Sequence, residues 1–509
     1  MTQSSVGATA EPVAAAPASG VGAALLRHSS IYLAGNLMQK ATAFLLIPIY
    51  TRVLSTAQYG LLELANTIVN LALVVAALGV PSAINKCLHR DCPDEAARRR
   101  LLGTTTLFTL LTTLALGSIG WLLQGVLAPL VAPGPAGLLV VRAVIVWVVL
   151  AQLTVIPLEM LRAAGRAHLY VGLSLAQLVT QSSVTLYLVL VRGSTLTGVL
   201  AGNVAGFLTV TLLGAAALLP RATWTFDRRL FRAALRYGLA MIPVFAASFV
   251  VNLSDRFFLG TLAGLGALGV YALGYKFGAL LDLLIVMPLQ RAWTPMFFGL
   301  SHRDDAPQIL ARVATAVAGL LMLGTVGMTL AVPAFLHLAA GAEFQSAAHY
   351  VPLVCIAYVL SGLSNSLGNG LVVAEKVPLI AGCAALGAMT SLACNALLVP
   401  RLAAYGAALS AIAAFGVQLT GVVTMLRRHY PTPLEWRRFA GMAAAALPAL
   451  VIGLSLPALP FAADAAARLA LLLSFPLLAV AFRVIHPDER AAAMRAAGDF
   501  LRSWRRARA

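Results

Sequence analysis

Charged residues are scarce in this chain. Asp, Glu, Lys and Arg make up 11% of its 509 residues, whereas hydrophobic residues make up 60%. A soluble globular domain is roughly a quarter charged and about half apolar. Together with the mean hydropathy of +0.89, this composition excludes a water-soluble enzyme, a disordered protein and a nucleic-acid-binding protein. It predicts an all-α, polytopic membrane protein.

Several chemical motifs are also missing from the sequence. It contains no Gly-Lys dipeptide, which excludes the usual phosphate-binding nucleotide loop, and its eight histidines form no metal-spaced pair. The five cysteines are an odd number and three of them lie in apolar runs, so no disulfide framework is expected. Cys87 and Cys92 flank a basic loop, and we interpret them as two reduced thiols and not as a metal pair. We expect neither a metal nor a cofactor.

Long apolar runs fill most of the chain. A helix needs about 20 apolar residues to cross a bilayer, and fourteen segments meet this requirement: about 31–51, 64–85, 101–123, 138–160, 168–191, 196–219, 238–260, 267–289, 313–336, 350–373, 378–399, 405–425, 439–459 and 465–485. Residues 1–26 are rich in Ala, Ser, Pro and Gly and lack the pattern of a signal peptide. They are predicted to be a disordered tail.

The distribution of the 36 basic residues predicts the orientation of the chain. With the N-terminus placed inside, 27 of them fall in inner connections and tails, 4 in outer connections and 5 within spans. Cytoplasmic loops of membrane proteins retain Lys and Arg in this way. The bias therefore supports the count of spans and predicts that both termini lie in the cytoplasm.

An internal repeat relates the two halves of the chain. Gly60 and Gly269 open similar segments 209 residues apart, and Arg27 and Arg236 are separated by the same distance. Six spans lie between equivalent points, so the two units have the same orientation and are related by an axis along the membrane normal. We predict an N-lobe at 27–219, a C-lobe at 237–428 and two additional helices at 429–486.

Two basic amphipathic stretches lie outside the spans. The connector at 220–236 alternates aromatic and aliphatic residues with five arginines, and the tail at 487–509 places apolar residues at helical spacing opposite arginines. Both are expected to lie on the anionic lipids of the inner leaflet, chiefly as anchors.

Ionisable residues within spans are the candidates for function, because each costs about 2.5–3.5 kcal/mol at mid-bilayer unless it faces water or a partner. Lys40 and Lys276 lie deep enough to indicate a polar cavity. Arg52 is equally compatible with anchoring at a lipid headgroup. Asp255 and Arg256 are adjacent and could neutralise one another, whereas Asp282 lies about 120° around the helix from Lys276 and does not pair with it directly.

These cations belong to spans one, two, seven and eight, and they predict a positively charged cavity between the lobes. Such a cavity selects an anion, and Lys and Arg both suit phosphate. Amide and phenol groups on the same helices could bind sugars, although asparagine in helix bundles often joins helices instead. These candidate sugar contacts are Asn36, Asn66, Asn70, Asn252, Tyr50, Tyr59 and Tyr271.

Four stretches resemble a known family. They are LLIPIYTRVLSTAQYGLLELANTI and LGVPSAINK in the first half, and SDRFFLGTLAGLGALGVYALGYKFG and RLAAYGAALSAIAA in the second. Over about residues 28–428 the chain is similar to the polysaccharide transporter family, the Wzx-type oligosaccharide flippases of the multidrug/oligosaccharidyl-lipid/polysaccharide exporter superfamily. The last two spans match only in number and hydrophobicity.

The resemblance implies two six-helix lobes plus two helices, and transport of an undecaprenyl-diphosphate-linked oligosaccharide by alternating access. Lys40, Arg52, Arg256 and Lys276 then become candidate diphosphate contacts, and Asp255 and Asp282 become candidate charge partners or cation sites. A polysaccharide polymerase or export protein becomes a candidate partner, and no enzymatic activity or nucleic-acid binding is expected.

Three alternatives remain open. A drug or metabolite antiporter of the same superfamily should have a more acidic cavity for cationic substrates, and a lipid II flippase shares the expected fold. A membrane glycosyltransferase is disfavoured because the outer connections are short and hold few acids, among them Glu63 at the edge of a span. The source of energy, a proton or sodium gradient or the removal of product, stays undetermined.

Overall fold

The computed structural model describes residues 46–80, 94–131, 135–218, 223–456 and 460–482, together with positions 44, 84, 87 and 220. Within these ranges the chain is helical and contains no strand. Eleven of the described helices are long and apolar enough to cross a membrane. The predicted fold class, an all-α polytopic membrane protein, is confirmed.

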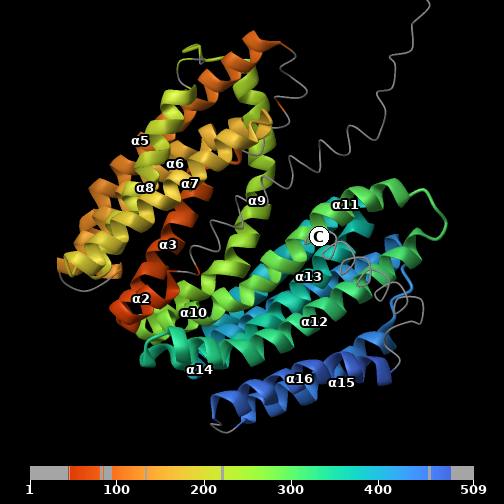
Figure 1. Cartoon of the computed structure of the whole chain (residues 1–509). Helices are drawn as coiled ribbons and strands as arrows, with labels where there is room; N and C mark the ends of the chain where they lie inside the picture. The colour runs from red at the N-terminus through yellow and green to blue at the C-terminus, as the bar shows by residue number, and fades with distance from the viewer. Residues whose placement is uncertain are drawn as a thin grey trace, which may run out of the picture.

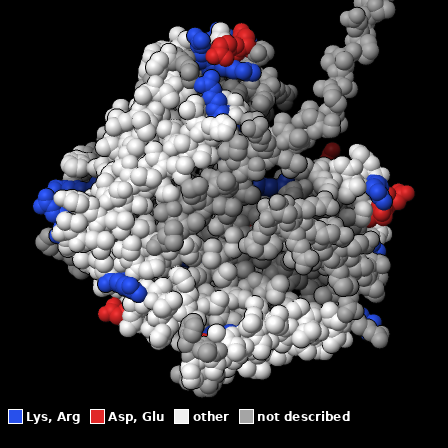
Figure 2. Space-filling model, viewed as in Figure 1, with Lys and Arg blue, Asp and Glu red and all other residues white. Residues whose placement is uncertain are grey.

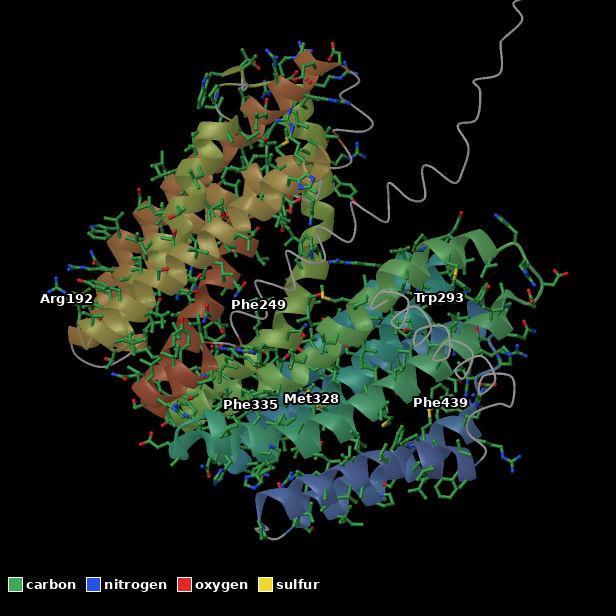
Figure 3. The ribbon with its side chains drawn as sticks, viewed as in Figure 1. Arg192, Phe249, Trp293, Met328, Phe335 and Phe439 are labelled. Carbon is green, nitrogen blue, oxygen red and sulfur yellow. The ribbon has the colours of Figure 1, made fainter. Side chains whose placement is uncertain are left out.

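The N-lobe is a bundle of long helices (Figure 1). The short helix α2 (Ile47–Val53) is the described end of the first predicted span. The others are α3 (Thr56–Ala77), α5 (Glu95–Val131), α6 (Pro135–Ala163), α7 (Ala167–Leu186) with the π-helical turn η1 (Tyr187–Val191), and α8 (Leu196–Leu218). Arg192 follows η1 at one tip of this lobe (Figure 3).

The C-lobe begins with α9 (Arg228–Phe258), which ends in the π-helical turn η3 (Leu259–Ala263). It continues through α10 (Leu265–Leu281), η4 (Asp282–Val286), α11 (Met287–Leu300), α12 (Ala306–Ala339), η5 (Ala342–Tyr350), α13 (Val351–Val373) and α14 (Val377–His429). The last two helices, α15 (Trp436–Ser455) and α16 (Phe461–Ala481), pack on α12 along the edge of this lobe (Figure 1).

The eleven helices contain twelve of the fourteen predicted spans, and the first and seventh spans are the other two. Helix α14 contains two of the spans, because its helical geometry breaks at Ala403 (φ 47°) and its two arms then run antiparallel, with Gly421 against Cys383. The seventh predicted span lies in α9, which is not among the eleven and also carries five arginines. The first predicted span is described only at position 44 and from residue 46 onward.

The two lobes meet where α3 crosses α10. A Cβ atom on Gly60 would lie 1.9 Å from the carbonyl oxygen of Leu265, and one on Gly269 would lie 2.0 Å from that of Thr56. Small residues allow membrane helices to approach this closely. Thr56 and Leu265 each precede their glycine by four residues, so the contact has two-fold symmetry. The glycines that mark the sequence repeat therefore lie on its axis.

Further contacts close the same end of the molecule. Arg52, in the last turn of α2, donates from Nη2 to the carbonyl oxygen of Leu338 at 3.0 Å. The rings of Tyr59 and Phe344 meet edge to face, with their centroids 5.4 Å apart. Phe335, near this end of α12, packs on Phe277 (Figure 3). Away from this end the lobes diverge (Figure 1), and Figure 2 shows a recess between them.

Helix α9 belongs to both lobes. Its first turns, which include the end of the predicted connector, place Leu230 and Ala234 in the core of the N-lobe. Its second half places Ala247 and Val251 in a core with α13 and α14. Pro243 lies between these two halves. A single helix therefore links the lobes where they diverge.

We expect Gly60→Ala to lower stability, because the added methyl group would meet the backbone of α10 and force the helices apart. Overpacking of this kind costs about 1–3 kcal/mol or more. The apparent midpoint of thermal unfolding in detergent measures the effect. Gly172→Ala is the matched control, since nothing lies within 4 Å of its added Cβ. Equal midpoints for the two variants would contradict the close α3–α10 contact.

Candidate functional site

An ion pair joins the lobes directly beside the glycine crossing. Lys276 lies seven residues after Gly269 on α10, and Glu63 lies three residues after Gly60 on α3. The Lys276 Nζ atom is 2.5 Å from Oε1 of Glu63 and 2.8 Å from the hydroxyl of Tyr59. Glu63 and Tyr59 are buried. A capping box between Ser55 and Gln58 fixes the start of α3 and so positions the side chains of Tyr59 and Glu63.

A second ion pair lies within the C-lobe at the end of α9. Arg256 Nη1 is 3.1 Å from Asp255 Oδ1 and donates to the carbonyl oxygen of Asn252 at 2.8 Å. The hydroxyl of Tyr271 donates to Asp255 Oδ2 at 2.7 Å. The Arg256 guanidinium also lies 4.4 Å from the ring centroid of Tyr275, a cation–π contact. Both carboxylate oxygens of Asp255 and the Nη1 atom of Arg256 therefore have a partner.

Hydrogen bonds extend this arrangement to α13, where the hydroxyl of Tyr358 donates to that of Tyr275 at 3.1 Å. The set of residues involved is called the polar cluster below: Tyr59, Glu63, Asp255, Arg256, Tyr271, Tyr275, Lys276 and Tyr358. Its two cations face two anions. Removing one partner of a buried pair typically costs about 3–5 kcal/mol, so the cluster holds α3, α9, α10 and α13 together only while its charges stay balanced.

The structure brings five of the predicted site residues into this cluster: Tyr59, Asp255, Arg256, Tyr271 and Lys276. The predicted possibility that Asp255 and Arg256 neutralise one another is what the structure shows, and both are buried at 3% and 6% exposure. Tyr59 and Tyr271 are fully buried, so neither offers its ring to a sugar in this conformation. Their predicted roles in substrate binding remain predictions.

The other predicted residues lie elsewhere. Lys40 and Asn36 fall outside the described residues. Arg52 binds α12 at the closed end, as described above, and Tyr50 beside it is half-buried. Asp282 opens the π-helical turn η4 and is half-buried.

Two of the predicted asparagines, Asn70 and Asn252, bind the backbone of their own helices. Asn70 is exposed and donates to the carbonyl oxygen of Asn66 at 2.8 Å. Asn252 donates to that of Ser248 at 2.8 Å. Asn66 and Asn252 are half-buried. In this conformation the side-chain amides of Asn70 and Asn252 therefore donate to carbonyl groups of the preceding helical turn.

Glu63 is the functional candidate that the sequence analysis missed. It was placed at the edge of a span and given no partner, and Lys276 was assigned to a cavity without one. A signal was present: Glu63 follows Tyr59 by one helical turn and belongs to the segment opened by the repeat glycine Gly60. Tyr275 and Tyr358 were missed as well, because a tyrosine in an apolar run carries no distinguishing pattern.

Exposed cations lie at the diverging side of the lobes. Arg162 on α6 and Arg291 on α11 are exposed and both act electrostatically on Tyr170 of α7, so the two lobes present positive charge near one point. Arg162 also forms an ion pair with Glu159, three residues before it on the same helix. Figure 2 shows a basic side chain within the recess between the lobes. In the described part of the chain, no group of three or more metal-ligating side chains occurs.

Two helical lobes that meet at one end, with an ion pair across the contact, define a multi-pass membrane protein with a two-lobed fold. The sequence model of a family described as "Polysaccharide biosynthesis protein" matches residues 25–301. The chain belongs to this polysaccharide biosynthesis family, and the predicted resemblance is confirmed. No match was found among curated proteins.

Solved structures share the fold at low sequence identity. The lipid II flippase MurJ in an inward closed conformation superimposes with a TM-score of 0.70 and 11% identity, covering 90% of this chain and 98% of MurJ. An inward-facing multidrug resistance MATE transporter has a TM-score of 0.60 and 14% identity, covering 76% and 94%. The MATE transporter VcmN of Vibrio cholerae has a TM-score of 0.57 and 14% identity, covering 81% and 98%.

We expect Lys276→Met and Glu63→Gln to be energetically coupled. Each variant leaves the other partner uncompensated, so a double-mutant cycle on thermal stability should give a coupling energy of about 1–3 kcal/mol. The Lys276 side chain is 34% exposed, which keeps the value below that of a fully buried pair.

The exposed Arg162–Glu159 pair provides the matched control for this cycle. Arg162→Gln and Glu159→Gln should couple by less than about 1 kcal/mol, since solvent screens the Arg162 side chain, which is 54% exposed. Additive effects of Lys276→Met and Glu63→Gln would show that the interlobe pair contributes nothing to the contact.

Proposed function

We propose that this protein is a flippase that translocates a polyprenyl-diphosphate-linked oligosaccharide across the bacterial plasma membrane for cell-surface polysaccharide biosynthesis. The observation that carries the proposal is family membership over residues 25–301 combined with a fold shared with a lipid flippase over 90% of the chain. The predicted excess of basic residues on one side places both termini in the cytoplasm. The closed end of the lobes then faces the outside.

Transport of such a lipid requires a protected route for its headgroup. Sugars and a diphosphate cannot cross hydrocarbon unaided, because each unsatisfied polar group costs kilocalories. A hydrated space between the lobes removes this barrier, while the polyprenyl tail stays in the surrounding lipid. Arg162 and Arg291 place cations of both lobes near the inner opening of this route, where an anionic headgroup would enter.

The Lys276–Glu63 pair supplies a mechanism that couples binding to opening. To open toward the outside, the lobes must separate α3 from α10 and pull Lys276 away from Glu63. A diphosphate that enters from the inside is an anion that can replace Glu63 on Lys276 and so reduce the cost of separation. Lys40, Arg52 and Arg256 are the further candidate diphosphate contacts, with Asp255 and Asp282 as charge partners or cation sites.

The proposal is tested by reconstitution of the protein in proteoliposomes with a fluorescent polyprenyl-diphosphate oligosaccharide, scored by the loss of signal when an external quencher reaches flipped lipid. We expect Lys276→Ala and Lys40→Ala to slow flipping about tenfold or more, as expected for the loss of one charged hydrogen bond to phosphate. Lys376→Ala is the matched control, because Lys376 is exposed in a turn between helices.

Other outcomes point to the alternatives. Faster movement of lipid II than of the oligosaccharide lipid identifies a lipid II flippase, and exchange of cationic dyes without lipid movement identifies an antiporter. Sugars missing from the lipid intermediates of a deletion strain identify a glycosyltransferase. Full flipping by both Lys40→Ala and Lys276→Ala contradicts the diphosphate assignment alone and leaves the transport activity intact.

A further inference from the structure

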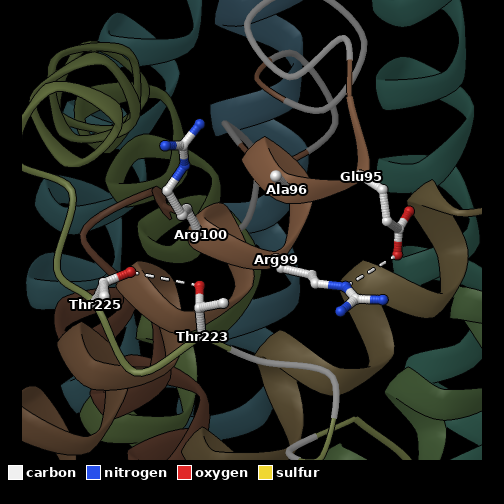
Figure 4. A pocket seen from close by; sticks show the side chains of 6 residues that line it. All are labelled: Glu95, Ala96, Arg99, Arg100, Thr223 and Thr225. Carbon is white, nitrogen blue, oxygen red and sulfur yellow. Dashed lines mark hydrogen bonds and ion pairs between the residues drawn. The ribbon is translucent and has the colours of Figure 1, made fainter.

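A hollow of about 500 Å³ lies at the basic end of the N-lobe, between the first turns of α5 and the segment 223–225 that follows α8. Its size is within the range of about 300–1,000 Å³ typical of small-ligand sites. Figure 4 shows the six residues that line it: Glu95, Ala96, Arg99, Arg100, Thr223 and Thr225. The predicted orientation places this hollow at the cytoplasmic leaflet.

The wall of the hollow is held in place by backbone contacts. A Cβ atom on Gly103 would lie 1.8 Å from the carbonyl oxygen of Thr223, so the segment crosses α5 at a point where only glycine fits. The hydroxyl of Thr104 accepts a hydrogen bond from the amide of Asp227 at 3.0 Å. The Asp227 side chain then caps α9 by accepting from the amides of Arg229 and Leu230. The hollow is therefore a defined part of the fold.

The lining suits a phosphate group. Arg99 is 3.6 Å from Glu95, and both side chains are more than half exposed, so this pair is weak and leaves most guanidinium donors available. Arg100 is exposed and lines the same hollow (Figure 4). The hydroxyls of Thr223 and Thr225 lie 3.4 Å apart on the opposite wall. Charged and hydroxyl donors thus approach one space from two sides.

An apolar groove of about 170 Å³ lies beside this hollow, between α5, α6 and α8 of the N-lobe. Trp224, which lines the groove, stands between Thr223 and Thr225 of the hollow, and Leu102 lines the groove one turn after Arg99 on α5. Leu110, Ile156, Pro157 and Leu218 continue the lining. Trp224 is 56% exposed, as is typical of tryptophan at the boundary of a membrane.

We propose that the hollow and the groove form one binding site for an anionic phospholipid of the cytoplasmic leaflet. The phosphate lies between Arg99, Arg100 and the two threonine hydroxyls, and an acyl chain follows the groove beneath Trp224. The site requires both parts of the ligand, since the cations select the headgroup and the groove binds the chain. It is separate from the polar cluster and does not depend on which substrate is transported.

The test is native mass spectrometry of the purified full-length protein with phosphatidylglycerol, phosphatidylcholine or inorganic phosphate. We expect one phosphatidylglycerol to bind more tightly than the others. Arg99→Gln with Arg100→Gln should weaken that binding about 10- to 30-fold, without changing the binding of phosphatidylcholine. Trp224→Ala should weaken the binding of both lipids, because it removes one wall of the groove.

Arg428→Gln with Arg437→Gln is the control, since it removes the same charge from exposed positions on the C-lobe and should leave binding unchanged. Unaltered phosphatidylglycerol binding by the Arg99 and Arg100 variant would overturn the proposal. An equal loss in the control would also overturn it, by showing that binding reflects net charge. Binding of inorganic phosphate as tight as that of the lipid would show a free-anion site instead.

Discussion

The contact between α3 and α10 determines how the rest of the molecule is arranged. Two glycines allow the backbones to touch, and this proximity brings Glu63 within hydrogen-bond distance of Lys276. Elsewhere the lobes pack mostly on themselves, so the position of one lobe relative to the other depends on this crossing and on the contacts near it. A small increase in the distance between α3 and α10 would separate Glu63 from Lys276 and leave both charges without this partner.

The symmetry of this contact does not extend to its charges. By the 209-residue repeat, the counterpart of Glu63 is Ala272 and that of Lys276 is Thr67. Each lobe therefore contributes one ionisable side chain that the other lacks. The glycines require only a shared backbone geometry, whereas the ion pair requires that the two halves differ. This difference makes the two-fold backbone contact chemically asymmetric, because one lobe supplies the anion and the other supplies the cation.

The sequence allowed the fold to be predicted well, because apolar length, charge bias and repeat spacing follow directly from the physics of a bilayer. Gly60 and Gly269 were recognised as equivalent, although their direct contact was not. The two spans joined in α14 were separated correctly in the sequence, even though the break is confined to Ala403. Conversely, the end of the predicted connector proved to be the start of α9, since a basic amphipathic stretch can continue into a span without a turn.

The site was less predictable. Depth in a span singled out Lys276, and an adjacent pair of charges within a span singled out Asp255 and Arg256, but neither feature can reveal a partner on another helix. The partner of Lys276 is 213 residues away, and only the packing of α3 on α10 brings it there. Pairing also determines whether a buried cation is available to a ligand, so a count of basic residues overestimates the positive charge that a closed conformation presents.

Pro243 makes helix α9 easier to bend between the lobes. Proline has no amide hydrogen, so α9 lacks one backbone hydrogen bond at the position where it passes from one core to the other. Bending there breaks fewer bonds than bending elsewhere along the same helix. Helix α9 can therefore bend at Pro243, which lets the lobes tilt while the hydrophobic core of each lobe stays intact.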